Sequence, residues 1–380
     1  MRGGSQMAFR KREQGFALAV SIFALVIIAA LITGIFFAAR QEMRIGENSL
    51  SAQRAFNAAD AGINAAVASW NMDWNNLATN ASATFNGSLP GGTGSYSGTV
   101  QRLNPQLFFV QVTGGDKNHL ATRTIGALSR LVLMSMAAKG ALTTQGQLKI
   151  GGSSFIDGVD ANPSGWSCSS VNDTMPGIAT GDSSSITTSG CNNYSCVRGK
   201  PKIQSDTSIN DSTFLKFGDL NFNDLVAMAT KVYPGSYGPA SDFAPQADGS
   251  GCLTGVMDNW GDPMRPASAP ACTNYFPIIY VNGDFKATGG YGQGILIVNG
   301  NLSVQGGFQF FGPVIVKGDI TTQGTGGHFN GGVLAANVNF QQDVIIGNAV
   351  VTYSSCALFK ALQANSPGRW LRQRSWVDLF

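Results

Sequence analysis

The hydrophobic pattern of the chain opens with one uncharged run near the N-terminus. Residues 16–39 carry no charged side chain, and these 24 residues are enough, as a tilted helix, to cross a hydrocarbon core about 30 Å thick. Arg10, Lys11 and Arg12 come before the run, and basic residues favour the cytoplasmic side of a membrane. A secretory signal has a shorter apolar run and a small-residue cleavage site. We therefore expect a membrane-spanning helix over residues 16–39.

The helical pattern continues beyond the apolar run. Residues 40–75 contain no proline and are rich in alanine, the residue with the highest helix propensity. Phe56, Ile63, Val67 and Trp70 follow one another at spacings of seven, four and three residues, which places them on one face of a helix. One long helix is predicted to leave the membrane and to pack on a domain through this face.

Short β-forming segments follow the predicted helix. Residues 96–103, 107–112 and 121–133 are rich in β-branched and aromatic residues, and turn sequences containing Gly, Asn, Asp or Pro bound them. We expect three antiparallel strands packed on the helix, in a small sheet domain over residues 82–134.

The C-terminal half contains an internal repeat. Each unit has an apolar strand, a polar turn with glycine and a second short strand, at residues 278–285, 295–302 and 314–320, and residues 333–338 and 350–353 continue the register. A period of about 17 to 19 residues fits one coil of a β-solenoid, in which stacking buries the apolar faces. Residues 140–146 resemble residues 318–324, so an earlier coil is expected there. Hairpins in a sandwich are the alternative.

The predicted fold class is α+β. The long helix and the small antiparallel sheet precede a β-solenoid-like (β-helix) domain with a long, disulfide-stapled insertion. The expected segments are a leader (1–15), a transmembrane helix (16–39), its continuation (40–75), the sheet (82–134), the coils (137–157 and 275–356), the insertion (158–274) and a basic, aromatic tail (357–380). The tail is expected to contact a membrane surface or partner, or to cap the solenoid.

Composition narrows the function further. Charged residues make up 12% of the chain and the formal net charge is only +3, so no strong field attracts nucleic acid. Six cysteines and two histidines lack the spacing of a zinc site. In an exported chain, an even number of cysteines indicates disulfides, with buried free thiols as the alternative. Cys252 and Cys272 flank a proline-rich loop and are the favoured pair, while no partners can be assigned to Cys168, Cys191 and Cys196.

Two further chemistries are considered for the exported region. Asp219, Asn221, Asn223 and Asp224 loosely resemble a calcium loop, but Gly at the sixth position and Glu at the twelfth are missing, so a capped helix start is the preferred interpretation. Asp284 and Asp319 lie at turns of the repeat and form no stacked acidic row, and no nucleophile motif accompanies His328. We therefore expect no enzyme and no cofactor, with calcium as an alternative.

The N-terminal residues resemble a known family. The sequence Lys-Arg-Glu-Gln-Gly-Phe-Ala-Leu at residues 11–18 resembles the class III leader of type IV pilins, and residues 53–62 resemble a segment of PilX-type pilus assembly proteins. The resemblance covers about residues 10–70. It implies that a prepilin peptidase cleaves between Gly15 and Phe16 and methylates the new terminus. Major pilins have Glu at the fifth mature position, where this chain has Val20, which suits a minor or tip subunit.

The resemblance implies a role in a bacterial type IV pilus or pseudopilus. The expected partners are other pilin subunits, the pilus assembly machinery, the prepilin peptidase and, before assembly, the inner membrane; the exported domain at the cell surface would meet a glycan or another cell. A membrane-anchored adhesin or carbohydrate-binding β-helix is one alternative. An anchored polysaccharide-degrading enzyme is the second.

Overall fold

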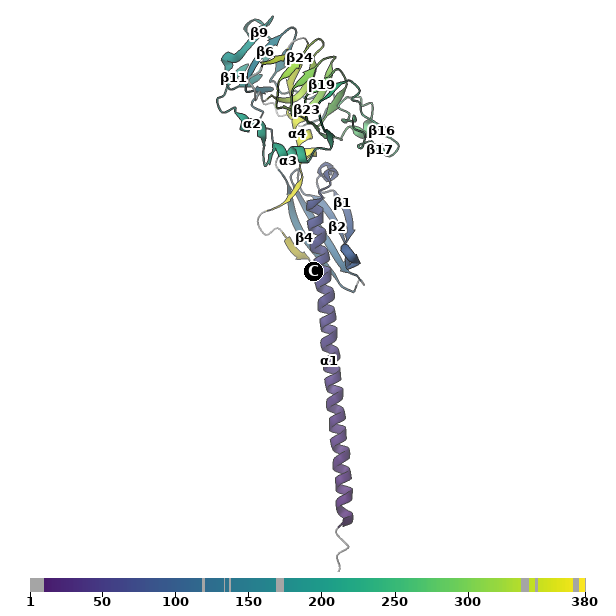
Figure 1. Ribbon diagram of the computed structural model, residues 1–380. Helices are drawn as coiled ribbons and strands as arrows, with labels where there is room; N and C mark the ends of the chain where they lie inside the picture. Colours follow the sequence, from purple (N-terminus) through teal and green to yellow (C-terminus); the bar gives the residue numbers. More distant parts are fainter. Residues whose placement is uncertain are drawn as a thin grey trace, which may run out of the picture.

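The molecule has three parts arranged in a line (Figure 1). Helix α1 (Arg10–Ala68) forms a long stalk, an antiparallel sheet covers its C-terminal end, and a β-rich head lies beyond that sheet. This arrangement fits the predicted α+β class. The computed structural model describes residues 10–117, 120–132, 134–136, 138–168, 174–335, 342–345, 348–371 and 376–379.

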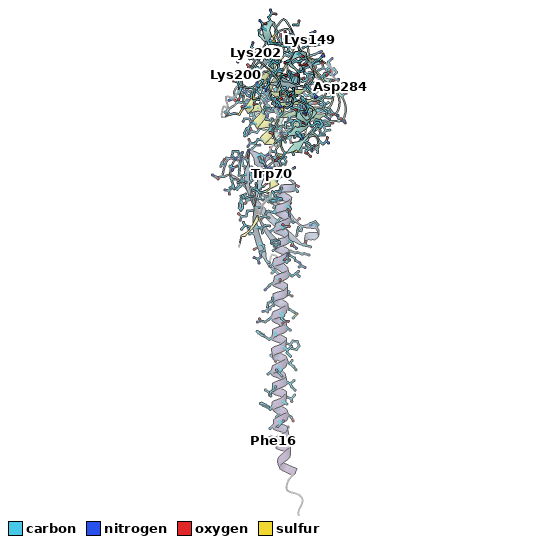
Figure 2. The ribbon with its side chains drawn as sticks, turned by 90° about the vertical axis from the view of Figure 1, so that its left-hand side faces the viewer. Phe16, Trp70, Lys149, Lys200, Lys202 and Asp284 are labelled. Atoms are coloured by element: carbon cyan, nitrogen blue, oxygen red, sulfur yellow. A yellow bond between two sulfur atoms is a disulfide. The ribbon has the colours of Figure 1, made fainter. Side chains whose placement is uncertain are left out.

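Helix α1 ends earlier than the sequence pattern predicted. It stops at Ala68, and the short 3₁₀ helix η1 (Met72–Asn76) follows. The Asn71 side chain accepts a hydrogen bond from the Asp73 N–H at 2.9 Å, so Asn71 starts η1 and interrupts the longer helix. The expected continuation to residue 75 is wrong at its C-terminal end. Trp70 lies where the stalk meets the sheet, at the opposite end of α1 from Phe16 (Figure 2).

The antiparallel sheet packs against the predicted apolar face of α1. Ala59, Ile63, Ala66 and Trp70 form a buried cluster with sheet residues, and Phe56 and Val67 pack against that cluster. Gly114 allows the close approach: a Cβ at this position would lie 2.2 Å from the Ala59 N and 2.3 Å from the Ala55 O. The helix backbone therefore lies directly on strand β3.

The sheet has more strands than the three that the sequence predicted. Its order is β1-β2-β3-β4-β28, and β29 also pairs with β4. The first strand was missed because its alternating exposed and half-buried residues give a weak hydrophobic pattern. The C-terminal tail adds two strands to this sheet, so the expectation that it caps the solenoid is wrong. The strands are β1 (Ser82–Ser88), β2 (Gly94–Arg102), β3 (Leu107–Asp116), β4 (Thr122–Leu131), β28 (Gly368–Trp370) and β29 (Trp376–Leu379).

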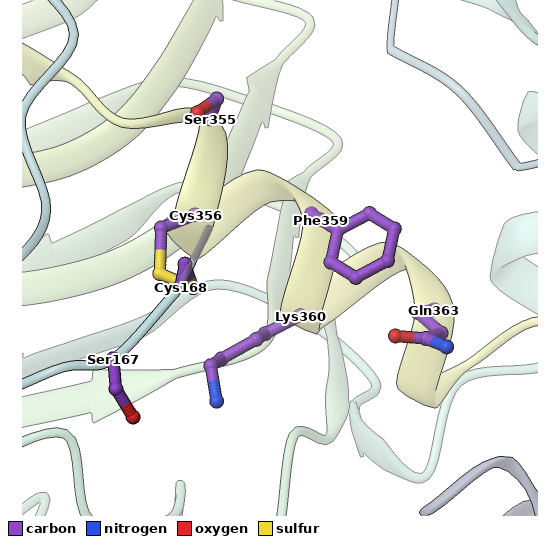
Figure 3. A pocket seen from close by; sticks show the side chains of 7 residues that line it. All are labelled: Ser167, Cys168, Ser355, Cys356, Phe359, Lys360 and Gln363. Carbon is purple, nitrogen blue, oxygen red and sulfur yellow. A yellow bond between two sulfur atoms is a disulfide. The ribbon is translucent and has the colours of Figure 1, made fainter. Parts of the chain in front are cut away.

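Helix α4 (Ser355–Ala364) joins the head to the sheet. The side-chain amide of Asn75, which belongs to η1, donates to the carbonyls of Gln363 and Ser366, both at 2.9 Å. At the other end of α4, a disulfide between Cys356 and Cys168 ties the helix to a distant part of the head (Figure 3). The backbone and these hydrogen bonds thus link the head to the sheet, and the disulfide fixes α4 to the head.

The head consists mainly of two parallel sheets. The first follows the order β10-β7-β27-β25-β23-β21-β18-β14, with β5, β8, β11 and β20 also paired to it, and the second follows β15-β19-β22-β24-β26-β6-β9. The strands of the C-terminal half are β14 (Lys231–Tyr233), β15 (Tyr237–Ala240), β18 (Ile278–Val281), β19 (Phe285–Ala287), β20 (Tyr291–Gln293), β21 (Ile295–Val298), β22 (Leu302–Val304), β23 (Phe308–Val316), β24 (Ile320–Thr322), β25 (Gly327–Ala335), β26 (Gln342–Ile345) and β27 (Val350–Tyr353).

The two halves of the head meet in the middle of these sheets. The late strands β25, β26 and β27 pair with the early strands β5, β6 and β7, so the coil expected near residue 140 stacks on the last repeat. The earlier strands are β5 (Leu142–Thr144), β6 (Gln147–Gly151), β7 (Phe155–Asp157), β8 (Ile178–Thr180), β9 (Ile186–Ser189), β10 (Val197–Arg198) and β11 (Ile203–Ser205).

The region predicted as an insertion between coils is partly built into the sheets. Strands β8, β9, β10 and β11 extend one end of the parallel ladders, and β14 and β15 extend the other. These strands are short and lie among Ser, Asn and Gly residues, so the sequence shows no clear repeat in this region. Around them lie α2 (Asp211–Leu215), α3 (Phe222–Ala227), the hairpins β12 (Lys216–Phe217) with β13 (Leu220–Asn221) and β16 (Ala247–Asp248) with β17 (Gly251–Cys252), and the turns η3 (Ser183–Ser185), η4 (Asn192–Tyr194) and η5 (Pro270–Cys272). The turn η2 (Pro90–Gly92) instead joins β1 to β2 in the antiparallel sheet.

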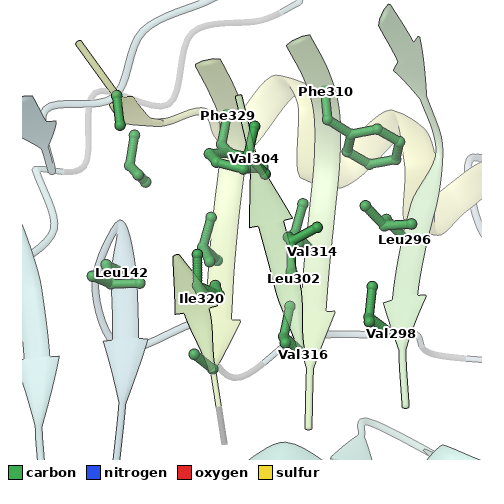
Figure 4. Packing of buried hydrophobic residues seen from close by; sticks show 14 of the residues in the cluster. Leu142, Leu296, Val298, Leu302, Val304, Phe310, Val314, Val316, Ile320 and Phe329 are labelled. Carbon is green, nitrogen blue, oxygen red and sulfur yellow. The ribbon is translucent and has the colours of Figure 1, made fainter. Parts of the chain in front are cut away.

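The ladders enclose a stacked apolar core. Leu296 pairs with Val314, Val314 with Val333, and Val333 with Leu142, and all four side chains are buried (Figure 4). Hydrogen bonds also run along one corner of the repeat. The Asp284 side chain accepts from the Asn301 N–H at 2.8 Å, and the Asn301 side chain accepts from the Asp319 N–H at 2.9 Å. Equivalent turn residues of successive repeats thus hold one another.

Candidate functional site

The N-terminal part of α1 is an exposed apolar surface. The segment Phe16–Ala68 contains a window with a mean hydropathy of 2.8 that is 0% buried, long and apolar enough to cross a membrane. Its few polar side chains are satisfied within the helix: Ser21 donates to the Ala17 carbonyl at 2.6 Å and Thr33 to the Ala29 carbonyl at 2.8 Å. Such a surface is stable against lipid or against other apolar helices.

The predicted processing residues lie at the free end of this helix. Gly15 belongs to α1, and residues 1–9 of the predicted leader lie outside the described residues. The Phe16 side chain is 74% exposed and Val20 is 52% exposed. In the described part of the chain, no partner covers either side chain. A neighbouring molecule therefore has free access to the end of the helix.

The cysteines form three disulfides. Cys252 pairs with Cys272, as favoured from the sequence, whereas Cys168 pairs with Cys356 and Cys191 with Cys196. The Cys168–Cys356 pair, 188 residues apart, could not be read from spacing, because it depends on α4 packing against β23 and β25 beside the segment that holds Cys168. The two shorter bridges lie near opposite ends of the ladders, close to β9 and β10 at one end and to β17 at the other.

An aromatic cluster closes the ladder end that carries β14. Trp260 is fully buried and stacks on Phe243 with ring centroids 4.0 Å apart. The Tyr233 and Tyr237 hydroxyls both donate to an Asp258 carboxylate oxygen at 2.9 Å. Burial raises the pKa of Tyr237 to about 12 and also raises the pKa of Tyr233. Both phenols hold the end loop in place.

Lys231 lies in the same end of the head, and sequence reasoning missed it. The side chain is 2% exposed, and its ammonium donates to the carbonyls of Thr254 and Val256. Burial lowers its pKa. An isolated lysine at the start of a three-residue strand gives no sequence signal of burial. Its contacts hold the loop that leads to Asp258.

The residues considered for calcium organise a helix start. Asn221 accepts hydrogen bonds from the Asn223 and Asp224 N–H groups at 2.9 and 3.1 Å, and the Asp224 carboxylate accepts from the Asn221 N–H at 2.9 Å. This is a capping box for α3. Asp219 forms an ion pair with Arg130 at 3.2 Å instead. Two of the four predicted ligands thus serve the backbone.

The described residues offer little for acid–base or metal chemistry. Within those residues, no group of three or more His, Cys, Asp or Glu side chains gathers to hold a metal ion. Asp284 serves the turn hydrogen bonds described above, and His328 lies half-buried on β25. His119 and the tail residues Arg372 and Arg374 lie outside the described residues.

Comparisons with known proteins include a weak structural likeness. No protein-family model and no curated protein matches the chain. The crystal structure of the competence-associated pilin ComZ from Thermus thermophilus is similar over 87% of this chain and 97% of that one, with 12% sequence identity and a TM-score of 0.23. A likeness at this score carries no weight for function.

Proposed function

We propose that this protein is a subunit of a type IV pilus or pseudopilus, and specifically a PilX-like minor or tip pilin. The observation that carries the proposal is the division of α1 into two halves. The membrane-length apolar half, beginning at Phe16, is free of the rest of the chain, and the other half packs on an antiparallel sheet. A signal anchor needs the first half only, whereas a filament subunit needs a rigid helix that carries its domain into a bundle.

The sequence around the free end of α1 supports processing by a prepilin peptidase. Gly15 and Phe16 resemble the cleavage site of type IV pilins, and Phe16 is exposed at the start of the apolar surface. Cleavage would leave an uncharged helix from Phe16 to Ala39, with its new amine at the tip. That helix can move laterally from the inner membrane into an apolar filament core.

Val20 supports a minor or tip position in the filament. In the family that this chain resembles, Glu at the fifth mature position pairs with the N-terminal amine of a neighbouring subunit. Val20 offers no carboxylate, and a carboxylate in lipid would need such a partner. A subunit at the tip of a filament has no neighbouring subunit above it and does not need this pairing.

The head suits display at the cell surface. We interpret its two parallel ladders as a β-solenoid, because successive strands pair in register at offsets of about 17 to 19 residues. Disulfides near both ladder ends and on α4 suit an oxidising compartment. Among the described residues, the carboxylates of Asp224, Asp258 and Asp284 each accept a hydrogen bond from another part of the protein. This structural use fits a non-catalytic role.

Peptidase-dependent assembly tests the proposal. The chain is co-expressed with a prepilin peptidase and the pilus machinery, and sheared surface filaments are probed for it. We expect the wild type to be cleaved and recovered in the filaments, and Gly15→Leu to stay uncleaved in the membrane. Gly46→Ala is the matched control, since nothing lies within 4 Å of Gly46 on the same helix. Equal recovery of wild type and Gly15→Leu in filaments would contradict the proposal.

A membrane-anchored, glycan-binding β-helix protein is the second candidate. The parallel ladders of the head favour it, because such surfaces present aligned side chains from successive strands. In this case α1 is only an anchor, and Gly15→Leu leaves surface display unchanged. The same fractionation therefore separates the two candidates.

A further inference from the structure

Helix α4 borders two neighbouring cavities at the junction of head and sheet. One has a volume of about 530 Å³ and is lined by Ser167, Lys360, Phe359 and Gln363, together with the Cys168–Cys356 disulfide and Ser355 (Figure 3). The other, of about 150 Å³, is lined by Leu131, Met134 and Leu362 and shares Phe359 and Gln363 with the first. We refer to these two cavities, which share lining residues of α4, as the groove along α4; they lie at the kind of domain junction where ligands commonly bind.

The larger cavity contains a cation without a counter-charge in the described part of the chain. Lys360 is half-buried, and its ammonium lies 5.8 Å from the Trp166 ring centroid, as does the Arg265 guanidinium. The described ion pairs involve neither residue. Burial and then the like charge of Arg265 lower the pKa of Lys360. An anion in the cavity would compensate this charge.

Arg265 and Lys360 differ in what they offer to a ligand. The Arg265 Nη1 already donates to the carbonyls of Asp262 and Met264 at 2.9 and 2.6 Å. Lys360 has no hydrogen bond among the described residues and lines the cavity directly. Arg265 does not line the cavity and adds only positive potential near it, whereas Lys360 is the group that can contact an anion.

The remaining lining combines an apolar platform with hydrogen-bonding groups. Phe359 is 56% exposed and lines both cavities, so its ring offers an apolar surface to a ligand. Figure 3 shows Lys360 extending toward Ser167 on one side of the helix, with the Phe359 ring and the Gln363 amide on the other. Ser355 is already used, because its hydroxyl donates to Asp160 at 2.5 Å. The Gln363 amide nitrogen donates to the Pro105 carbonyl at 3.5 Å, so its side-chain oxygen is the group that remains to accept a hydrogen bond from a ligand.

We propose that this groove binds an acidic sugar, a pyranose that carries a carboxylate on its ring. The carboxylate contacts the Lys360 ammonium, one C–H face of the ring packs on Phe359, and Ser167 and Gln363 hydrogen-bond to hydroxyls. A bare inorganic anion leaves the phenyl ring uncovered, and a purely apolar ligand leaves Lys360 unpaired. The proposal concerns the head alone and does not depend on how α1 is used.

The test compares sugar acids with their methyl esters. Full-length protein in detergent is titrated at low salt with the methyl glycosides of glucuronate, galacturonate and N-acetylneuraminate, and with the neutral methyl ester of each, using ligand-observed NMR. At least one acid is expected to bind more tightly than its ester. Lys360→Met should weaken that acid roughly tenfold or more and leave the ester unchanged. Phe359→Ala should weaken both forms.

The control variant is Lys286→Met, which removes an exposed lysine from the outer side of β19. It should bind like wild type, and thermal unfolding checks that all variants are folded. If no acid binds more tightly than its ester, or if Lys360→Met binds like wild type, the proposal is wrong. Lys360-dependent binding of an acidic peptide, such as acetyl-Asp-Leu-Phe-amide, without binding of any sugar acid would also overturn it.

Discussion

Replacing Gly114 by alanine tests the contact between α1 and the sheet. The new Cβ would lie 2.2 Å from the Ala59 N, 2.3 Å from the Ala55 O and 2.8 Å from the Ala58 carbonyl carbon. All three neighbours are backbone atoms of one helix, so no side-chain rotation can relieve the overlap. The helix must move away from β3, which also loosens the packing of Ile63 and Trp70.

The expected effect follows from two opposing contributions. Overpacking of a tight contact costs about 1–3 kcal/mol, while replacement of glycine by alanine in the unfolded chain returns about 0.4–1 kcal/mol. Gly249→Ala is the matched control, because nothing lies within 4 Å of that position. Gly249→Ala should gain the unfolded-chain contribution without the cost of overpacking. The two variants should differ by about 1–3 kcal/mol.

Thermal unfolding of the full-length protein in detergent measures the difference. Near-ultraviolet circular dichroism follows Trp70 and Trp74, whose ring centroids lie 5.0 Å apart at the end of α1. The sheet and the end of α1 that it covers form a unit of roughly 60–100 residues, for which Tm falls by roughly 4–8 °C per kcal/mol, so Gly114→Ala should unfold several degrees below the control. Equal midpoints for the two variants would refute the backbone contact between α1 and β3.

Three further predictions concern the head. Asn301→Ala should destabilise the head by about 1–3 kcal/mol, because the Asp319 N–H loses its acceptor. The control Asn223→Ala, at an exposed helix start, should change stability little, and chemical denaturation compares the two variants. Replacing a cysteine pair by alanine should destabilise the head more when the disulfide closes a longer loop. The expected loss is about 3 kcal/mol for Cys252–Cys272 (separation 20) and about 2 kcal/mol for Cys191–Cys196 (separation 5). The reverse order in chemical denaturation would contradict this. Hydrogen bonds from Lys139 and then Ser208 lower the pKa of Asp206 to about 2 in the folded protein. The pKa of an aspartate in the unfolded chain is about 4, so ionised Asp206 stabilises the fold above that pH. This stabilisation is lost as the pH falls from about 4 through 2. Asp206→Asn should give a shallower fall in Tm over that interval, and an unchanged slope would argue against the ion pair.

The sequence predicted the elements whose patterns are local. The uncharged run from Phe16 and the stripe through Phe56, Ile63 and Val67 mark α1, because each depends on spacing within a single helix. The repeat at Ile278, Ile295 and Val314 was visible because identical strand and turn types recur at nearly constant spacing. In each case, neighbouring residues carry the information.

The features that sequence reasoning missed depend on distant parts of the chain. Strands β28 and β29 return to β4 from the C-terminus, and Cys168 reaches Cys356 across 188 residues. Strands β8 and β11 are three residues each, too short for a periodic pattern to identify. The groove along α4 is likewise invisible in the sequence, since Arg265, Lys360 and Trp166 meet only after both halves of the head have stacked.

Mass spectrometry of the mature N-terminus tests the central claim most directly. The protein is purified from bacterial cells that contain a prepilin peptidase, and its N-terminal peptide is sequenced and weighed. The account predicts a chain that begins with N-methylated Phe16. A mature protein that retains Met1 or Met7 at its N-terminus in the membrane fraction would contradict it.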